Sequence, residues 1–259
     1  YQQSYSIPRF YGAKVELFFL NQEDWSLDEE KFKEVVGNDT KLICLTTPNN
    51  PTGMNFSAEE VNFIIETARS CGAYIFADEA YRGLNHFGNS YSKSFADMYE
   101  KGIATGSMSK SYSLAGIRLG WVVADSDIIN KINLNREYNT ISISALDDYV
   151  ASVALNHHEK IVQRNLSIVK EGKQIVKDFI ENQKVFSWVE PNSATICCVK
   201  YDLEENSFDF CDRILRDTGV LTVPASAFEY EKFFRLGYAM DKKLLTDALS
   251  LISNFINKS

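Results

Sequence analysis

The sequence predicts an α/β fold with a mostly parallel sheet, followed by a smaller α+β part. In the first half, short apolar segments at residues 41–45, 73–77 and 102–106 alternate with helical patterns, as in βαβ units. A long helical pattern then runs from about residue 145 to 176, and a mixture of strand and helix patterns follows it. This order of patterns is typical of a large α/β domain joined to a small one.

The elements of the first half follow from local patterns. Residues 14–19 have a strand pattern and residues 41–45 form an apolar run of strand length, and turn residues 46–53 follow the second segment. A helix is predicted over 57–70, because Ser57 is a suitable N-cap and Glu60 has the spacing of a capping box. Two more strands at 73–77 and 102–106 and a helix at 126–133 complete this half.

The second half opens with the long helical pattern, which we expect to break near Asn156 and His157. The patterns beyond it predict strands at 195–199, 220–223 and 233–236 and helices at 207–217 and 242–256. Three strands and two helices form a small α+β unit.

Polar clusters follow three of the predicted strands of the first half. They occupy residues 46–53, 78–81 and 107–110. Ligands of open parallel sheets bind outside the carboxyl ends of the strands. We therefore expect the three clusters to converge on one crevice.

The third cluster has the most distinctive chemistry. Lys110 follows Ser107 and Ser109, and Arg118 comes soon after. A buried lysine amine tends to lose its charge and become nucleophilic, while hydroxyls and a guanidinium suit a phosphate dianion. This set predicts a pocket for an aldehyde that carries a phosphate, and pyridoxal phosphate is a cofactor of that kind.

Four motifs together resemble one family. They are Asn49-Asn50-Pro51-Thr52-Gly53, Asp78-Glu79-Ala80-Tyr81, Ser107-x-Ser109-Lys110 with Arg118, and Phe234-Arg235-Leu236-Gly237-Tyr238-Ala239. Their order and spacing resemble the class I/II aminotransferases, which are fold type I pyridoxal-phosphate-dependent enzymes. The resemblance implies a three-layer α/β/α large domain at residues 1–157, here incomplete, and a small C-terminal α+β domain at 158–259.

The resemblance also implies the catalytic roles. Lys110 would hold the cofactor as a Schiff base and later move a proton on the substrate. Asp78 would pair with the pyridine nitrogen, and Asn50 and Tyr81 would hydrogen-bond the phenolate oxygen of the cofactor. Asn50 would also lie against the substrate. Taken singly, these residues have structural explanations as well, such as a turn cap for Asp78.

The same resemblance assigns the remaining binding residues. Ser107, Ser109 and Arg118 would hold the phosphate, although serines at such positions also serve as plain N-caps. Arg235 would bind the substrate α-carboxylate; pairing with a surface acid is the alternative. Tyr1 would stack on the cofactor ring.

The chain departs from the family at its start. It begins with Tyr1 and lacks the family's N-terminal portion, including a glycine-rich loop that contributes to the phosphate site, so we expect a fragment of a longer enzyme. Another departure is Ala225, where the family usually has glycine after the proline.

Composition excludes some classes of partner. The formal net charge of −8 argues against nucleic acid and anionic membranes, and no apolar run is long enough for a membrane span. The 5 cysteines have no metal-ligand spacing and are expected in the core of a cytoplasmic protein. The 3 histidines show no such spacing either, so no metal site is predicted.

The resulting hypothesis is an aminotransferase that moves an amino group from an amino acid to a 2-oxo acid. The resemblance implies a homodimer, because family sites are completed by the partner subunit. Two alternatives stay open: a C–S lyase, decarboxylase or synthase on the same fold, and a cofactor-binding module without catalytic activity.

Overall fold

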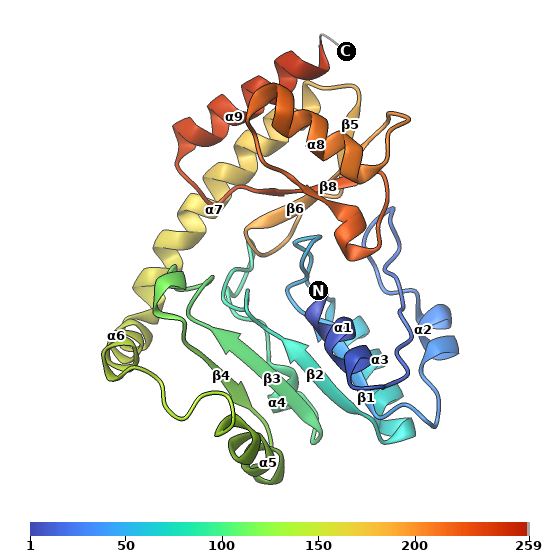
Figure 1. Ribbon diagram of the computed structural model, residues 1–259, viewed down its shortest axis with the longest axis vertical. Coiled ribbons are helices and arrows are strands. Elements are labelled where there is room, and N and C mark those ends of the chain that lie inside the picture. Colours follow the sequence, from blue (N-terminus) through green and yellow to red (C-terminus); the bar gives the residue numbers. More distant parts are fainter. Residues whose placement is uncertain (258–259) are drawn as a thin grey trace.

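The computed structural model describes residues 1–257 and contains two sheets (Figure 1). The first, sheet A, has the strand order β1 (Leu42–Thr46), β2 (Tyr74–Asp78), β3 (Gly102–Ser107) and β4 (Gly120–Val123). The first three strands are parallel, and β4 pairs with β3 in the antiparallel direction. The mostly parallel sheet and its three predicted strands are therefore confirmed, whereas β4 was not predicted.

Helix α3 (Ala58–Cys71) is the best-defined helix of the βαβ units. The Ser57 hydroxyl accepts the Glu60 N–H at 3.1 Å, and the Glu60 carboxylate accepts the Ser57 N–H at 2.7 Å, which confirms the predicted capping box. Gly72 ends the helix with a φ of 72°, a conformation that glycine adopts at little cost. Ile64, Ile65 and Ala68 of α3 belong to the core under sheet A.

Further short helices surround sheet A. Of these, only α5 was predicted; Figure 1 shows α1 in front of the sheet. They are α1 (Gln3–Phe10), α2 (Glu29–Val35), α4 (Phe95–Met98), the 3₁₀ turn η1 (Ala115–Ile117) and α5 (Ser126–Arg136).

The strand predicted at residues 14–19 is wrong. This segment has no strand partner and is held by side chains instead. Phe18 packs edge-to-face on Phe32 of α2, with ring centroids 4.8 Å apart, and the Leu20 N–H donates to the Tyr230 hydroxyl at 3.3 Å. The strand-like pattern reflects the packing of single side chains such as Phe18, which is partly buried against the core, rather than pairing in a sheet.

Two helices connect the sheets. Helix α6 (Ala145–Asn156) ends next to α7 (His158–Glu181), so the predicted break near Asn156 and His157 is confirmed. In Figure 1, α7 extends from the side of sheet A to the side of sheet B.

Sheet B has the strand order β5 (Phe186–Trp188), β6 (Ile196–Tyr201), β8 (Phe233–Gly237) and β7 (Val223–Pro224) and is antiparallel throughout. The strand predicted at 220–223 is thus only β7, and β5 was not predicted. The sheet packs against α7, α8 (Ser207–Thr218) and α9 (Lys242–Ile256), and the 3₁₀ turn η2 (Ala225–Phe228) precedes β8.

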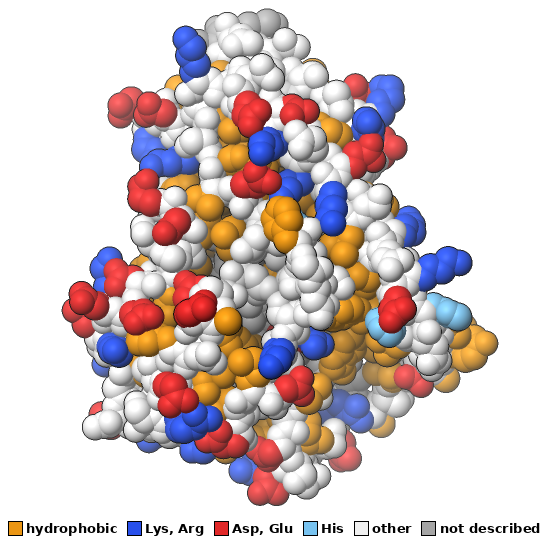
Figure 2. Space-filling model, turned by 180° about the vertical axis from the view of Figure 1, so that it is seen from behind, with side chains coloured by type: hydrophobic (Ala, Val, Ile, Leu, Met, Phe, Trp, Pro, Cys, Tyr) orange, Lys and Arg blue, Asp and Glu red, His pale blue; other side chains and the backbone are white. Residues whose placement is uncertain are grey.

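Much apolar surface remains exposed around β4, α5 and α6. All four residues of β4 are exposed, and α5 buries none of its residues. Figure 2 shows hydrophobic side chains reaching the surface on the back of the molecule. The exposed large side chains of this region include Trp121, Val122, Val123, Leu134, Tyr138, Ile141, Leu146 and Tyr149. Within residues 1–257, no helix has the length and apolar character that crossing a membrane requires.

Candidate functional site

The first polar cluster forms a tight loop after β1. Asn49 organises it, since its side-chain oxygen accepts the Thr52 hydroxyl at 3.0 Å and its backbone carbonyl accepts the Gly53 N–H at 2.9 Å. Asn50 is only 8% exposed in this loop. A Cβ atom on Gly53 would lie 2.2 Å from the Ile196 carbonyl oxygen, so this glycine permits close contact between the loop and β6.

The second cluster begins at the end of β2. Asp78 is the last residue of that strand and pairs in register with Thr46 of β1 and Thr105 of β3. Its carboxylate accepts the Ala80 N–H at 3.1 Å. Burial raises the pKa of Asp78, although the hydrogen bonds from Ala80 and Thr105 favour the charged form.

Tyr81 lies at the centre of the predicted residues. Its side chain is 6% exposed, and burial raises the pKa of the phenol. The Arg235 charge acts in the opposite direction, whereas Tyr1 and Asp78 are close enough to raise the pKa further. Four of the predicted residues therefore interact electrostatically around one hydroxyl.

Lys110 projects from the loop that follows β3. This loop is closed by backbone hydrogen bonds from Met108 to Leu119 at 3.1 Å and from Leu114 to Met108 at 3.0 Å. The Lys110 side-chain amine lies 5.8 Å from the centre of the Tyr81 ring. Lys110 is exposed, so the expectation of a buried lysine is wrong for this chain.

Of the three residues predicted to bind phosphate, the two serines lie together in one turn and the arginine does not bond to them. Ser107 and Ser109 belong to the turn that precedes Lys110, and the Ser107 hydroxyl accepts the Ser109 N–H at 3.0 Å. Arg118 is exposed, and its guanidinium donates to the Ala115 carbonyl at 2.7 Å. Among residues 1–257 no hydrogen bond joins Arg118 to either serine, although Gly120, two residues later, pairs with Ser107 in the sheet.

Arg235 brings sheet B into the site. This β8 residue donates from its guanidinium to the Asn50 side-chain oxygen at 2.9 Å, and the guanidinium carbon lies 5.3 Å from the centre of the Phe228 ring. The alternative of a surface pair with Asp241 is not what the structure shows. Asn50 and Arg235, predicted separately, are therefore in direct contact.

Tyr1 lies beside the predicted site residues described above. Figure 1 shows the N-terminal end between the two sheets, and the side chain is 44% exposed. Its carbonyl accepts the Ser4 N–H at 3.0 Å at the start of α1. Tyr1 raises the pKa of Tyr81 electrostatically, so it lies near that residue; its stacking on the cofactor ring stays a prediction.

One neighbour was missed by sequence reasoning. Thr195 is near enough to the Tyr81 phenol to lower its pKa, yet the sequence indicated only that Thr195 begins a strand. The contact joins two distant parts of the chain, and no local pattern predicts such a pair.

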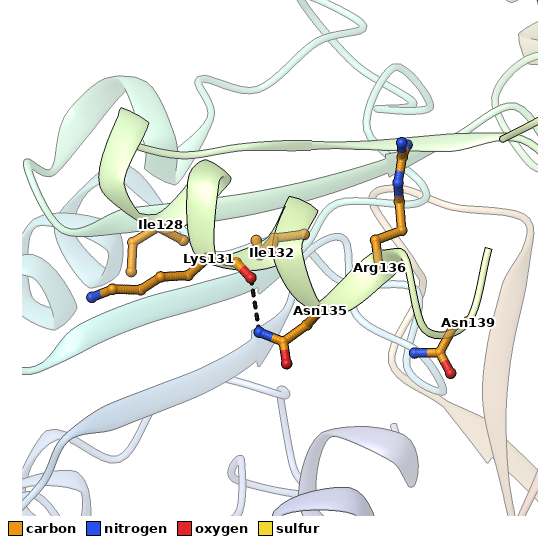
Figure 3. A pocket seen from close by; sticks show the side chains of 6 residues that line it. All are labelled: Ile128, Lys131, Ile132, Asn135, Arg136 and Asn139. Atoms are coloured by element: carbon orange, nitrogen blue, oxygen red, sulfur yellow. Dashed lines mark hydrogen bonds between the residues drawn. The ribbon is translucent and has the colours of Figure 1, made fainter. Parts of the chain in front are cut away.

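A small hollow of about 30 Å³ is lined in part by Ser107 and Glu79. Another hollow, of about 460 Å³, is lined by α5 and the turn after it, namely Ile128, Lys131, Ile132, Asn135, Arg136 and Asn139 (Figure 3). It does not include the convergent residues, so we do not assign the site to it. No cluster of three or more potential metal ligands occurs within residues 1–257.

Comparison with known proteins agrees with the motifs. The sequence profile described as "Aminotransferase class I and II" matches residues 1–252, and the chain belongs to this family. Membership in the family implies a pyridoxal phosphate cofactor.

Individual relatives show how much of the fold is shared. The crystal structure of a PLP-dependent aminotransferase from Streptococcus suis is 36% identical with a TM-score of 0.94, covering 100% of this chain and 68% of that one. Aspartate aminotransferase from Thermotoga maritima is 28% identical over 94% of this chain and 63% of its own length. Capreomycidine synthase from Streptomyces vinaceus is 24% identical over 93% of this chain. The chain spans less than two thirds of these two curated relatives, 62% and 63%.

Proposed function

We propose that this chain binds pyridoxal phosphate at the carboxyl ends of β1, β2 and β3 and serves amino transfer from an amino acid to a 2-oxo acid. The observation that supports it most is the contact between Asn50 and Arg235 at 2.9 Å, close to Tyr81, whose ring centre lies 5.8 Å from the Lys110 amine. It joins a site on sheet A to an arginine on sheet B. We also propose that residues 1–157 form the large domain and residues 158–259 the small one; residues 258–259 lie outside the described part.

The donor set fits this cofactor. Asp78 offers a carboxylate at the end of β2, suited to a protonated ring nitrogen, and Tyr81 and Asn50 offer groups for a phenolate oxygen. The Lys110 amine is exposed and free to form a covalent bond with an aldehyde. Ser107 and Ser109, in the turn before Lys110, would hold the phosphate together with Arg118, which follows the same loop, and Tyr1 offers an aromatic face.

The chain's own residues then have separate tasks. The bound cofactor supplies an electron sink for a carbanion at the substrate Cα. The Asp78 carboxylate keeps the ring nitrogen protonated, and the Lys110 amine carries a proton to and from the substrate. The Arg235 guanidinium binds the substrate carboxylate through bidentate hydrogen bonds, while its hydrogen bond to Asn50 orients both side chains.

A covalent-capture experiment tests the binding proposal. The purified chain is incubated with pyridoxal phosphate, reduced with borohydride and digested, and the modified lysine is located by mass spectrometry. We expect modification at Lys110, its loss in Lys110→Ala and its retention in Lys184→Ala, an exposed control lysine between α7 and β5. A site-specific adduct that survives Lys110→Ala would contradict the assignment.

Reaction type needs a second measurement. One relative is a synthase, and the same binding groups serve lyase and synthase chemistry. Conversion of bound pyridoxal phosphate to its amine form by an amino acid, with release of the matching 2-oxo acid, would support amino transfer. Release of ammonia without any oxo-acid acceptor would favour a lyase instead. A homodimer completes the proposal, and light scattering of the purified chain tests it.

A further inference from the structure

The residue after Lys110 is buried, whereas Lys110 itself is exposed. Ser111 is only 1% exposed, and its hydroxyl donates to the Arg82 carbonyl at 2.6 Å. Arg82 directly follows Tyr81 in the chain. One buried hydrogen bond therefore ties the backbone next to Lys110 to the backbone next to Tyr81.

The Ser111 backbone is bound by a second buried group. Helix α7 supplies Asn165, which is 5% exposed and whose side-chain amide donates to the Ser111 carbonyl at 2.9 Å. The Asn165 side-chain oxygen accepts the Arg164 guanidinium at 2.8 Å. Because a guanidinium only donates, this bond keeps the N–H₂ group of Asn165 directed at Ser111. The hydroxyl and the carbonyl of Ser111 thus bind two different segments of the chain.

The Lys110 loop, residues 108–114, contains a backbone conformation that its own sequence does not favour. Ser113 has a φ of 57° although it is not glycine, and its N–H donates to the Lys110 carbonyl at 3.1 Å. Residues with a Cβ keep this left-handed conformation only where the surroundings hold them. Ser111 lies inside the turn that this hydrogen bond closes, so its two buried bonds are placed to hold the turn.

The exposed Lys110 side chain needs a fixed loop if its amine is to have a defined place. Its aliphatic stem is flexible, so the position of the amine relative to the Tyr81 ring, 5.8 Å away, depends on where the backbone of the loop lies. A misplacement of a reacting group by about 1 Å can cost about 100-fold in rate.

We propose that Ser111 is a positioning residue for Lys110. Its hydroxyl fixes the Lys110 loop against the backbone that follows Tyr81, and Asn165 fixes Ser111 from α7. Ser111 acts through the placement of Lys110 rather than on the aldehyde itself. Its effect on the capture of pyridoxal phosphate rests on the proposed function, whereas the fixed loop does not.

Hydrogen exchange of the cofactor-free chain, followed by mass spectrometry, tests the loop itself. Ser111→Ala removes the hydroxyl, and Asn165→Asp keeps the shape of the side chain but replaces the amide donor with an oxygen. Both variants are expected to speed exchange in residues 108–114 by about 3-fold to 10-fold, the effect of one lost hydrogen bond. Thr218→Val is the control, because it removes a hydroxyl that donates at 2.6 Å to the Ile214 carbonyl in α8, and it should leave exchange in the Lys110 loop unchanged.

Two aldehydes separate positioning from accessibility of the amine. Formaldehyde with a borohydride reagent methylates any accessible lysine, so its rate at Lys110 is expected to be the same in Ser111→Ala and in the wild type. Capture of pyridoxal phosphate at Lys110 is expected to fall by about 10-fold or more in Ser111→Ala and to stay at the wild-type level in Thr218→Val. A general loss of stability would change both reactions alike, so only a positioning role produces this split.

Three results would overturn the inference. They are unchanged exchange of residues 108–114 in folded Ser111→Ala and Asn165→Asp, faster exchange in Ser111→Ala with undiminished capture of pyridoxal phosphate, and failure of both variants to fold, which would make the role of Ser111 structural. If the wild-type chain captures no pyridoxal phosphate at Lys110, the proposed function fails, and the exchange experiment still decides whether Ser111 fixes the loop.

Discussion

Gly53→Ala should damage the contact between the two sheets far more than its backbone conformation alone predicts. Gly53 has a φ of +74°, and an added Cβ would lie 2.2 Å from the Ile196 carbonyl oxygen and 2.8 Å from the Pro191 Cβ. The first obstacle is backbone of β6, so it cannot rotate away as a long side chain would. The Gly53 carbonyl also accepts the Ser193 N–H at 2.9 Å, and the clash would break this bond.

Gly219 provides a matched control for the size of the effect. Its φ of +75° is nearly the same, and nothing lies within 4 Å of an added Cβ. Gly219→Ala should therefore cost only the left-handed conformation, about 1–2 kcal/mol. Gly53→Ala carries that cost and an overpacking cost of about 1–3 kcal/mol, so a total of about 2–5 kcal/mol is expected.

Urea unfolding followed by circular dichroism measures both variants against the wild type. In Gly53→Ala we also expect weaker capture of pyridoxal phosphate at Lys110, because the loop that carries Asn50 must move. If the two variants lose the same free energy of unfolding to within about 0.5 kcal/mol, the close approach of the loop to β6 is not a real constraint.

Three further changes probe other parts of the molecule. Burial raises the pKa of Asp78 in the folded state, so ionisation of this carboxylate lowers the free energy of unfolding as pH rises through the folded-state pKa. Asp78→Asn should therefore be more stable than wild type in urea at neutral pH. This difference in stability should vanish below about pH 3.9, the pKa of an aspartate in the unfolded chain, because Asp78 is then protonated in both the folded and the unfolded state. A stability difference that does not change with pH would contradict the prediction. Ser57→Ala removes the cap of α3 and should cost about 1 kcal/mol in the same assay, whereas no loss would mean that the capping box contributes nothing. Phe234 is fully buried in the sheet B core, and Phe234→Ala should cost about 3–5 kcal/mol, with a loss below about 1 kcal/mol counting against that packing.

The elements that could be predicted are those with a local physical signal. Strands β1, β2 and β3 were evident from short apolar runs, because buried side chains recur along each of them. The start of α3 was evident because its cap and capping glutamate are three residues apart. Strand β4 carries no such signal: its residues are exposed on both faces, so no alternation of apolar and polar positions marks it.

The candidate site depends on contacts that local sequence patterns do not predict. Each motif could be placed at the end of a strand from its own neighbourhood, and the parallel order of β1 to β3 then brings Asn50, Asp78 and Lys110 to one edge. The bond between Asn50 and Arg235 spans 185 positions and depends on how α7 carries the chain from sheet A to sheet B. The same applies to Thr195, which lies near Tyr81 directly after the buried, left-handed residue Ala194. Neither contact can be inferred from a pattern of residue types, because both arise from packing between segments that are far apart in the sequence. The exposure of Lys110 has a similar origin: whether a lysine is buried depends on which other segments cover its loop, and the residues beside it carry no information about them.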